Sequence, residues 1–521
     1  MNASTDPLLL AIDCGTQSVR ALLIDPRGEI VAKAQHAFDN YVSLHDGWME
    51  HDADGFWLST ASVCRRLLHE HAGIAGRILG IVVTTQRGTL VPVDAAGRPL
   101  RRFIVWLDQR RASRTRRLSP WWRLAFKAAR VGATVDYFTR EAELNWIAEH
   151  EPHLLAKTHK VLLLSGWLNY RLTGRFADSI GSQVGYLPFD FKHQRWAPGW
   201  DWKWQALAVR REQLPELVNV GSVIGELSRE AAEATGLPAG LPVIAGAADK
   251  ACEIVGAGAI TPDIGALSYG TTATIDITTP AYVEATPFLP PYPAVLPGQY
   301  NTEVQIFRGY WMVSWFKEQF GHPERAEELS GGGPAERLFD RMVAAVPPGS
   351  QGLMLQPYWT PGIRHPGPDA RGAVIGFSDV HTRAHLYRAI LEGLAYALRD
   401  GKERIEKRSG VPITSLRVSG GGSQSDAAMQ LTADIFGLPA ARPHTYETSG
   451  LGAAIAGAVG LGLHADFPSA VAAMTRLGRQ FEPDARHAGL YESLYRRIYL
   501  HMYERLAPLY AEMQAVLRQP N

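Results

Sequence analysis

The chain has 521 residues, 46% of them hydrophobic and 20% charged, which excludes a disordered protein and predicts at least two globular domains. Lysine and arginine number 53 against 52 acidic residues, a balance that predicts neither a nucleic acid nor a membrane as partner and favours a small molecule. Three widely spaced cysteines exclude a disulfide framework. We therefore expect a cytoplasmic protein.

Two β-meanders organise the chain. Residues 8–35 contain the apolar runs LLLAID, VRALLID and EIVAKAQ, separated by glycine-containing turns, and this pattern predicts three antiparallel strands within an α/β half. The segment GALSYGTTATIDITT at 265–279 repeats the plan of strand, Gly-Thr turn and strand. The glycine-rich segment GAGAITP lies between the two halves, so we place the domains at 1–258 and 259–521.

The two Gly-Thr turns are candidates for binding phosphate. The chain has no Walker A loop and no GxGxxG between a strand and a helix, so phosphates would need another cradle. Glycine lets the backbone amides of a tight turn approach an anion, and hydroxyl side chains add donors. An ordinary hairpin is the competing interpretation for each turn. The candidate residues are Gly15, Thr16, Gln17 and Ser18 in the first turn and Gly270, Thr271 and Thr272 in the second.

Two aspartates follow buried apolar runs. Asp13 ends the first strand beside the first turn, where it either caps that turn or holds Mg²⁺, which prefers few carboxylates and keeps several waters. Asp249 follows LPVIAGAA and precedes a short helix. It either caps that helix or accepts a proton from a hydroxyl during phosphoryl transfer.

Two further segments have a ligand-binding and a structural interpretation. The turn at 420–422 contains three glycines between a strand and a helix, which favours close approach by a nucleobase or ribose over a simple connection.

The segment 98–130 holds eleven basic residues against one acid, with Trp121 and Trp122 among them. Because no RNA-binding motif accompanies it, a solvated basic face is favoured over an RNA site.

In this order, the motifs resemble those of the FGGY carbohydrate kinases. DCGTQSVRALLID and SYGTTAT resemble the two phosphate motifs of that family, AGAADKACEIVGAG its catalytic segment and SGGGSQSD its adenosine motif. The resemblance covers nearly the whole chain. It implies two ribonuclease H-like domains of the actin-like ATPase superfold with an interdomain cleft, and phosphorylation of a small sugar or polyol by ATP with Mg²⁺.

The resemblance also assigns roles to individual residues. Asp249 would be the general base, and Asp13 together with Asp249 would organise Mg²⁺. The turn residues named above would surround the phosphates of ATP. The adenosine side would be formed by Gly421, Gly422, Ser425 and Asp426, and the substrate side by Gln86, Arg87, Trp106, Asp108, Tyr137 and Asp249.

The substrate side departs from the family subgroups. Gln86 and Arg87 resemble the pair found in glycerol kinases, but Gly88 replaces the acidic residue that follows there, and Lys250 fits neither glycerol nor xylulose kinases. The chain therefore resembles an unassigned branch of the family, and the resemblance implies a ketose of the xylulose or ribulose type or a glycerol-like polyol as acceptor. Homodimeric and homotetrameric states are both compatible with the resemblance.

Two other functions remain open at this stage. An ATPase switch akin to actin or the heat-shock chaperones would act on a protein partner and share the superfold. A sugar-binding regulator without catalysis would not need Asp13 and Asp249. The carbohydrate kinase explains both carboxylates and the substrate-side residues, and we favour it.

Overall fold

The chain folds into two compact units. The computed structural model describes residues 6–38, 41–331, 335–360, 366–367 and 369–517. Unit 1 consists of the described parts of Met1–Gly256, Tyr292–Tyr300 and Glu447–Thr475. Unit 2 consists of those of Ala257–Pro291, Asn301–Tyr446 and Arg476–Asn521.

The course of the chain differs from the predicted domains in two segments. The first crossing lies between Gly256 and Ala257, close to the predicted division at 258 and 259. The prediction assigned residues 292–300 and 447–475 to the second domain, whereas the structure groups both with unit 1. The sequence pattern of a segment shows which element it forms but not which core it joins.

Close packing of two helices explains why residues 447–475 return to unit 1. Helix α15 (Thr448–Gly460) packs on α9 (Asp249–Gly256). A Cβ atom at Gly452 would lie 1.9 Å from the carbonyl oxygen of Cys252, and one at Gly256 would lie 2.0 Å from that of Thr448. Glycine at both positions therefore lets the two backbones touch.

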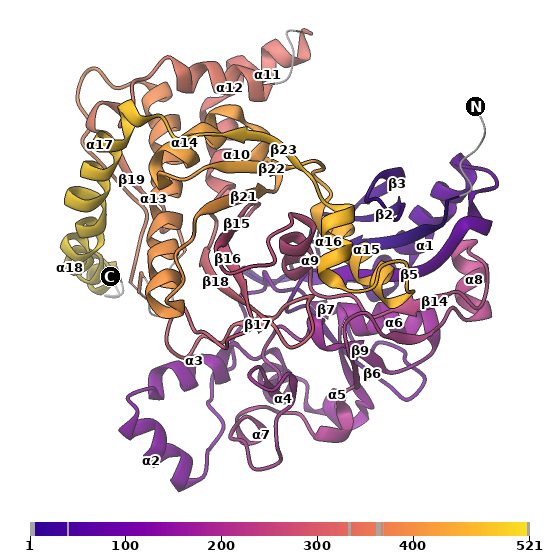
Figure 1. Ribbon diagram of the computed structural model, residues 1–521. Coiled ribbons are helices and arrows are strands. Elements are labelled where there is room, and N and C mark those ends of the chain that lie inside the picture. Colours follow the sequence, from indigo (N-terminus) through magenta and orange to yellow (C-terminus); the bar gives the residue numbers. More distant parts are fainter. Residues whose placement is uncertain (1–5, 39–40, 332–334, 361–365, 368, 518–521) are drawn as a thin grey trace. The chain divides into compact units, whose positions relative to one another are not determined.

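The main sheet of unit 1 has the strand order β13-β14-β5-β1-β2-β3 (Figure 1). The predicted meander is confirmed, since β1, β2 and β3 pair antiparallel in succession. β1 also pairs parallel with β5, and β5 with β14. Every residue of β1 is buried, as expected for a central strand covered on both faces. The strands are β1 Leu8–Cys14, β2 Ser18–Ile24, β3 Ile30–Ala37, β5 Ile78–Thr85, β13 Val223–Glu226 and β14 Pro242–Ile244.

Helices and a small second sheet complete unit 1. Helix α1 (Ala53–Glu70) packs against β2 and β3, and α15 packs against β1 and β5. The second sheet has the order β4-β7-β6-β8 and carries a separate apolar cluster around Trp146 and Ile147. Its strands are β4 Glu50–His51, β6 Leu90–Val93, β7 Phe103–Ile104 and β8 Lys160–Leu163; nearby helices are α2 Pro120–Ala128, α3 Gly132–Glu141, α4 Glu143–His150, α6 Leu164–Thr173 and α7 Lys203–Ala206.

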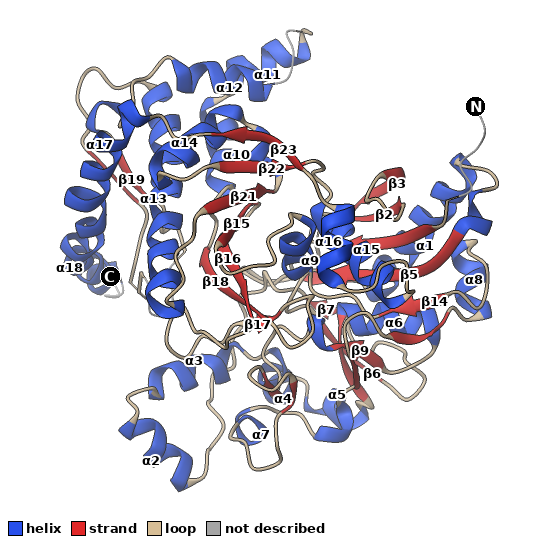
Figure 2. Cartoon of the chain, viewed as in Figure 1, coloured by secondary structure: helices blue, strands red, loops and turns tan. Residues whose placement is uncertain are grey.

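Unit 2 repeats the plan of unit 1. Its sheet runs β18-β16-β15-β21-β22-β23, with β15 and β16 antiparallel, β15 parallel to β21, and β21 parallel to β22 (Figure 2). The second predicted hairpin is thereby confirmed. Both units thus follow a hairpin with parallel strands and an antiparallel edge strand. The strands are β15 Ile264–Tyr269, β16 Ala273–Thr279, β18 Tyr300–Ile306, β21 Ser415–Ser419, β22 Ala440–Pro443 and β23 Leu477–Phe481.

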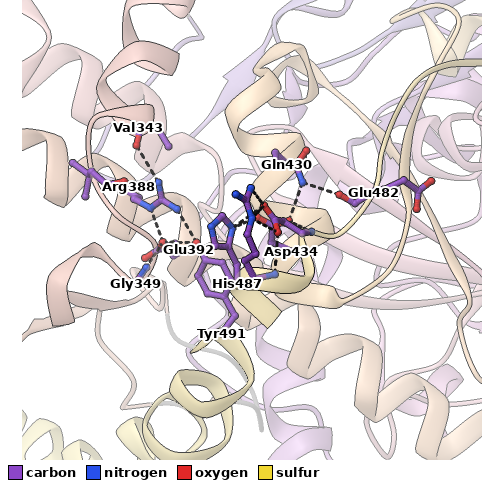
Figure 3. A network of polar contacts seen from close by, with 12 residues as sticks. Val343, Gly349, Arg388, Glu392, Gln430, Asp434, Glu482, His487 and Tyr491 are labelled. Carbon is purple, nitrogen blue, oxygen red and sulfur yellow. Dashed lines mark hydrogen bonds and ion pairs between the residues drawn. The ribbon is translucent and has the colours of Figure 1, made fainter. Parts of the chain in front are cut away.

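A polar network fixes the helices that pack in unit 2 (Figure 3). Arg388, on the long helix α13 (Arg383–Ser409), donates to Glu392 at 2.8 Å, to the Tyr491 hydroxyl at 2.8 Å and to the carbonyl oxygens of Val343 and Val346. Arg388 and Glu392 are 6% and 3% exposed. A buried ion pair is tolerated only when its remaining donors and acceptors are satisfied, and this one meets that condition.

A second part of the network joins α14 (Asp426–Phe436) to α17 (Ala485–Leu494). The Asp434 carboxylate accepts from Gln430 and from the Asp484 amide, both at 2.8 Å, and lies 3.1 Å from Nδ1 of His487 (Figure 3). Because Tyr491 of α17 contacts Arg388 and Glu392 as well, one helix connects both halves of the network.

We predict that Arg388→Met lowers the free energy of unfolding by about 3–5 kcal/mol, because Glu392 would remain buried without its cation. Urea denaturation measures this change. Arg486→Met is the matched control: Arg486 pairs with Asp484, but its side chain is 84% exposed, so little change is expected. Equal stability of the two variants would contradict a structural role for the buried pair.

Candidate functional site

The parallel strands of unit 1 bring three predicted site residues to one sheet edge. Asp13 is the penultimate residue of β1, and Gln86 directly follows β5. Cys14 pairs with Thr85, and an isolated bridge joins Thr85 to Ala248, the residue before Asp249. In an open α/β sheet, ligands bind beyond the carboxyl ends of the strands, which is where these side chains lie.

Asp13 is a buried carboxylate that Arg20 contacts. It is 4% exposed, and Arg20 donates to its Oδ2 at 3.2 Å. Burial raises the pKa of Asp13 to about 7, although Arg20 opposes the rise and Asp249 adds to it by repulsion. The carboxyl groups of Asp13 and Asp249 are therefore close enough to interact electrostatically. Sequence reasoning missed Arg20, which lies across the hairpin opposite Asp13 in the strand register.

Asp249 begins helix α9, as the sequence predicts. Its Oδ1 accepts a hydrogen bond from the Lys250 amide at 2.8 Å, so it caps the helix in part. Burial raises its pKa, while the positive charges of Lys250 and Arg87 oppose that rise. The Lys250 ammonium itself lies 2.7 Å from Glu253, and the two form an ion pair. Asp249 thus combines the capping position with a partly buried carboxylate that holds a proton more readily than usual.

The two carboxylates suit Mg²⁺ better than a metal bound by protein ligands alone. Among the residues that the structure describes, no three His, Cys, Asp or Glu side chains gather into a metal-binding group. Mg²⁺ is usually held by one or two carboxylates together with waters and substrate phosphates. Asp13 and Asp249 provide that number.

The first Gly-Thr turn is linked to two predicted substrate-side residues. The Thr16 hydroxyl donates to Oε1 of Gln86 at 2.9 Å and accepts from Nε1 of Trp106 at 2.9 Å. The Gln86 side chain is buried, and its Nε2 makes no hydrogen bond within the described part of the chain. A buried donor without a partner is costly, so this amide favours a ligand oxygen. Tyr41, which sequence reasoning missed, supports the turn by donating to the carbonyl oxygen of Thr16.

The other residues of the first turn act mainly through the backbone. The Gly15 amide donates to the Ser18 carbonyl at 3.0 Å, which closes the turn. The carbonyl of Gln17 accepts from Phe38 at 2.9 Å, and the Gln17 side chain is exposed. The buried Ser18 hydroxyl accepts from Gln35 at 3.1 Å. Ser18 therefore has a structural partner already.

The remaining predicted substrate residues have separate environments. The Arg87 guanidinium lies 4.9 Å from the ring centre of Tyr292, a residue absent from the predictions that belongs to the segment returning to unit 1. The Asp108 carboxylate accepts from the Met49 amide at 2.6 Å and from Arg110 at 2.7 Å and 2.8 Å. Among the described contacts, no hydrogen bond links Asp108 to the Thr16–Gln86–Trp106 group. Tyr137 instead lies under Arg111, 5.6 Å from its guanidinium carbon.

Asp178, a buried aspartate that sequence reasoning missed, organises a turn that contacts the segment leading to Asp249. Asp178, on β9 (Ala177–Ser179), is 0% exposed and accepts from Ser165 and Gln183, both at 2.8 Å. The next residue, Ser179, donates to the Gly246 carbonyl at 2.5 Å, and the Ala248 amide donates to Gly181 at 3.0 Å. The strand end that leads to Asp249 thus rests on the turn that Asp178 organises.

In unit 2 the Gly-rich turn lines a small pocket. Gly421, Gly422 and Ser425 form one wall, and Tyr310, Lys317 and Leu391 are among the other lining residues. A Cβ atom on Gly422 would lie 2.4 Å from the Tyr310 ring, so glycine is required there for close packing. The aromatic and apolar walls suit a flat base. Tyr310 immediately precedes α10 (Trp311–Phe320), and Lys317 lies on that helix. Sequence reasoning missed both because neither lies in a recognised motif.

Ser425 and Asp426 shape this turn through their own contacts. Ser425 caps α14 by accepting from the Ala428 amide at 3.0 Å, and its hydroxyl also donates to Asp340 at 2.5 Å. The Asp426 carboxylate pairs with Arg442 at 2.6 Å. Arg442 also donates to the carbonyl of Gln424 at 3.1 Å, which ties the turn to β22.

The second Gly-Thr turn stands at the carboxyl end of β15. Gly270 and Thr271 lie between β15 and β16, Thr271 is exposed, and Thr272 is buried. The Thr271 carbonyl accepts from the Trp311 amide at 3.3 Å, so this turn is joined to the helix beside the pocket. Gly420 has φ +82° and packs directly on Tyr269, the last residue of β15.

Comparison with known proteins identifies the family. The model of the FGGY family of carbohydrate kinases, N-terminal domain, matches residues 8–256, and that of the C-terminal domain matches 265–461. The chain belongs to the FGGY family of carbohydrate kinases. The predicted carbohydrate kinase is thereby confirmed, and the switch and inactive-regulator alternatives are not retained.

Individual FGGY relatives align along nearly their whole length. The chain is 30% identical to the sugar kinase YgcE of Escherichia coli K12 over 94% of this chain and 92% of that protein. It is 30% identical to a glycerol kinase of Dechloromonas aromatica, with 96% and 98% covered. The crystal structure of xylulose kinase from Rhodospirillum rubrum superposes with a TM-score of 0.80 at 26% identity, covering 97% and 100%. The predicted two-domain α/β fold is therefore confirmed.

No helix among the described residues is both long and apolar enough to cross a membrane.

We predict that Gly422→Ala raises the KM for ATP about tenfold, because the added methyl group forces the Tyr310 ring into the pocket. Steady-state kinetics at saturating acceptor measure the change. Gly489→Ala, on α17 with no atom within 4 Å of the added Cβ, is the control and should leave the KM unchanged. An unchanged KM in the Gly422 variant would show that ATP does not use this pocket.

We also predict a pH-dependent stability effect of Asp178→Asn. Burial raises the pKa of Asp178 to about 6, so the folded protein binds a proton more tightly than the unfolded chain. The stability from this proton is present at low pH and is lost as the pH rises through about 6. The free energy of unfolding of the wild type minus that of Asp178→Asn should therefore be larger at about pH 5 than at about pH 7.5. The change between the two pH values should be about 1 kcal/mol.

Urea denaturation at the two pH values tests this prediction. Ser165→Ala removes a donor that lowers the pKa of Asp178 but keeps the titrating group, so the pH dependence should remain and move to higher pH. A pH-independent difference between wild type and Asp178→Asn would contradict the raised pKa.

Proposed function

We propose that this FGGY kinase transfers the γ-phosphate of ATP to a hydroxyl of a small sugar or polyol, with Asp249 as the general base. The acceptor class is a ketose of the xylulose or ribulose type or a glycerol-like polyol. The observation that carries the proposal is the Asp249 carboxylate: it is partly buried, its pKa is raised, and it lies at the sheet edge that also holds Asp13 and the Gln86 amide, whose Nε2 makes no hydrogen bond within the described residues.

Asp249 has the properties that proton transfer requires. A general base works best when its pKa lies near the working pH, and the pKa of an exposed carboxylate lies well below it. Desolvation raises the pKa of Asp249 and so moves it towards the working pH. The cationic side chains of Lys250 and Arg87 keep part of its population ionised. Ionised Asp249 accepts the hydroxyl proton as the acceptor oxygen attacks phosphorus and the bond to the ADP oxygen breaks.

The acceptor is oriented by neutral and cationic donors. Gln86 Nε2 donates to one hydroxyl, and Arg87 offers a planar fork for a vicinal pair. The Trp106 ring, fixed through its bond to Thr16, covers an apolar face of the carbon chain. Asp108 and Tyr137 remain predicted substrate residues, and the contacts of Asp108 with Arg110 and Met49 favour an indirect role in shaping this region.

ATP is held by the glycine turns. The turns at residues 15–18 and 270–272 surround the phosphates, and the pocket beside Gly421 and Gly422 takes the adenine. Asp13 and Asp249 would hold Mg²⁺, which would supply positive charge to the phosphate oxygens. Asp13 must be ionised for this role, and Arg20 favours its ionised form. Homodimeric and homotetrameric assemblies both accord with the proposal.

Asp249→Asn should reduce kcat by about 10²- to 10⁴-fold and leave ATP binding intact, because asparagine keeps the helix cap but cannot accept the proton. ADP release over a panel of ketoses and polyols measures turnover, and calorimetric titration with a non-hydrolysable ATP analogue measures binding. Asp54→Asn, at an aspartate whose side chain is 70% exposed, is the control and should retain activity. Wild-type turnover by the Asp249 variant with any acceptor would refute the base assignment.

A further inference from the structure

The segment 114–130 forms a basic, partly apolar surface that the kinase reaction does not use. It contains six cationic residues and no acidic one, although the whole chain carries a formal net charge of only +1. Helix α2 lies within it, and no residue of that helix is buried. In Figure 1 the helix lies at the periphery of unit 1. The cations are Arg114, Arg116, Arg117, Arg123, Lys127 and Arg130.

Contacts on one side of α2 fix its orientation. Trp122 stacks on Phe126 with ring centres 5.5 Å apart, and Phe126 meets Trp202 edge-on at 5.3 Å. At the start of the helix, the Ser119 amide donates to Oε1 of Gln205 at 2.7 Å. The opposite side of α2 is therefore presented consistently to solvent.

The solvent side of α2 combines apolar and cationic side chains. Trp121, Leu124 and Ala128 follow the spacing i, i+3, i+7, so they share one stripe. Trp121 is 71% and Leu124 is 62% exposed. Arg123 and Lys127, four residues apart, form an exposed row beside that stripe. Burying two large apolar side chains would be favourable, yet the described protein leaves both in water.

The cations of this surface are not neutralised internally. Across the described residues, none of the six forms an ion pair with a carboxylate, and the Arg116 guanidinium donates to a backbone carbonyl, that of Gln205, at 3.2 Å. Positive charge beside an exposed tryptophan and leucine is typical of helices that lie in the interface of an anionic bilayer.

We propose that the outer face of α2 docks on the surface of an anionic phospholipid membrane, with Trp121 and Leu124 inserted among the headgroups and Arg123 and Lys127 against lipid phosphates. A membrane fits better than a nucleic acid, because the stripe presents aliphatic as well as aromatic surface. It fits better than a stable protein partner, since a helix of nine residues offers far less than the roughly 800 Å² per side of a standard interface. Binding through one short helix is reversible.

Sedimentation with lipid vesicles tests the proposal on the full chain. The probes are vesicles of phosphatidylcholine alone and vesicles containing about 30% phosphatidylglycerol, at low and at physiological salt. The protein should sediment with the anionic vesicles only, and less at the higher salt. Arg123→Glu/Lys127→Glu removes two positive charges and adds two negative ones. Loss of the two cations alone should weaken binding about 25-fold, from about fivefold per charge, and the added negative charges should weaken it further. Trp121→Ala/Leu124→Ala should weaken it at both salt concentrations.

Two controls separate docking from general effects of charge and hydrophobicity. Arg229→Glu/Arg325→Glu changes the net charge by the same amount as the α2 charge variant, at two exposed positions outside α2. Leu329→Ala removes a leucine that is 89% exposed. Both controls should bind as the wild type does. All variants should keep wild-type kinase activity, because none alters a residue of the proposed site.

Three results would overturn the proposal: no sedimentation with anionic vesicles at low salt, equal binding by the α2 variants and the wild type, or binding to single-stranded RNA without binding to vesicles. Tryptophan fluorescence adds a measurement of position. A blue shift on mixing with anionic vesicles that disappears in Trp121→Ala supports insertion of Trp121, and an unchanged spectrum contradicts it.

Discussion

The parallel pairing of β1, β5 and β14 is the constraint on which the arrangement of the site depends. This pairing places the carboxyl ends of three strands at one edge: Asp13 is the penultimate residue of β1, Gln86 directly follows β5, and Asp249 begins the helix that follows β14. Asp13, Gln86 and Asp249 are separated by long stretches of sequence, so only the sheet brings them together. Asp13 and Gln86 are buried there and Asp249 is partly buried, and desolvation raises the pKa of both aspartates.

The same order of strands in unit 2 places different chemistry at the corresponding ends. The end of β15 leads into the Gly270–Thr271 turn, and the end of β21 into the Gly420–Gly422 turn. Where unit 1 has carboxylates, unit 2 has glycines, which make room for the Tyr269–Tyr310 stack with ring centres 4.3 Å apart. One topology thus provides charged groups suited to proton transfer and metal binding in one unit and a flat, largely neutral pocket in the other.

The features that could be predicted from the sequence depend on short-range patterns. Both hairpins follow from apolar alternation and glycine turns, and the places of Asp13 and Asp249 follow from where apolar runs stop. The return of residues 447–475 to unit 1 depends on glycine contacts between α9 and α15, which no local pattern reveals. Arg20 and Asp178 were missed for the same reason: each acts through tertiary neighbours.

Asp108 illustrates a different limit of sequence reasoning. A carboxylate between Trp106 and two arginines fits substrate binding when it is considered by position alone. In the structure it is enclosed by Arg110, which also pairs with Glu50 at 2.9 Å, and its side chain is only 3% exposed. A residue's type and spacing do not indicate whether its hydrogen-bonding capacity is already used within the protein.

The ion pair of Lys250 with Glu253 has a consequence for the proposed base. A lysine next to a catalytic aspartate would, if it bonded directly to it, stabilise the carboxylate and reduce its basicity. Glu253 holds the ammonium at 2.7 Å, one turn further along α9, so Lys250 acts on Asp249 through space and through its backbone amide. Burial then outweighs the two neighbouring cations, and the pKa of Asp249 stays above its usual value. Helix α9 therefore accommodates a cation beside the proposed base without removing the basicity that proton transfer requires.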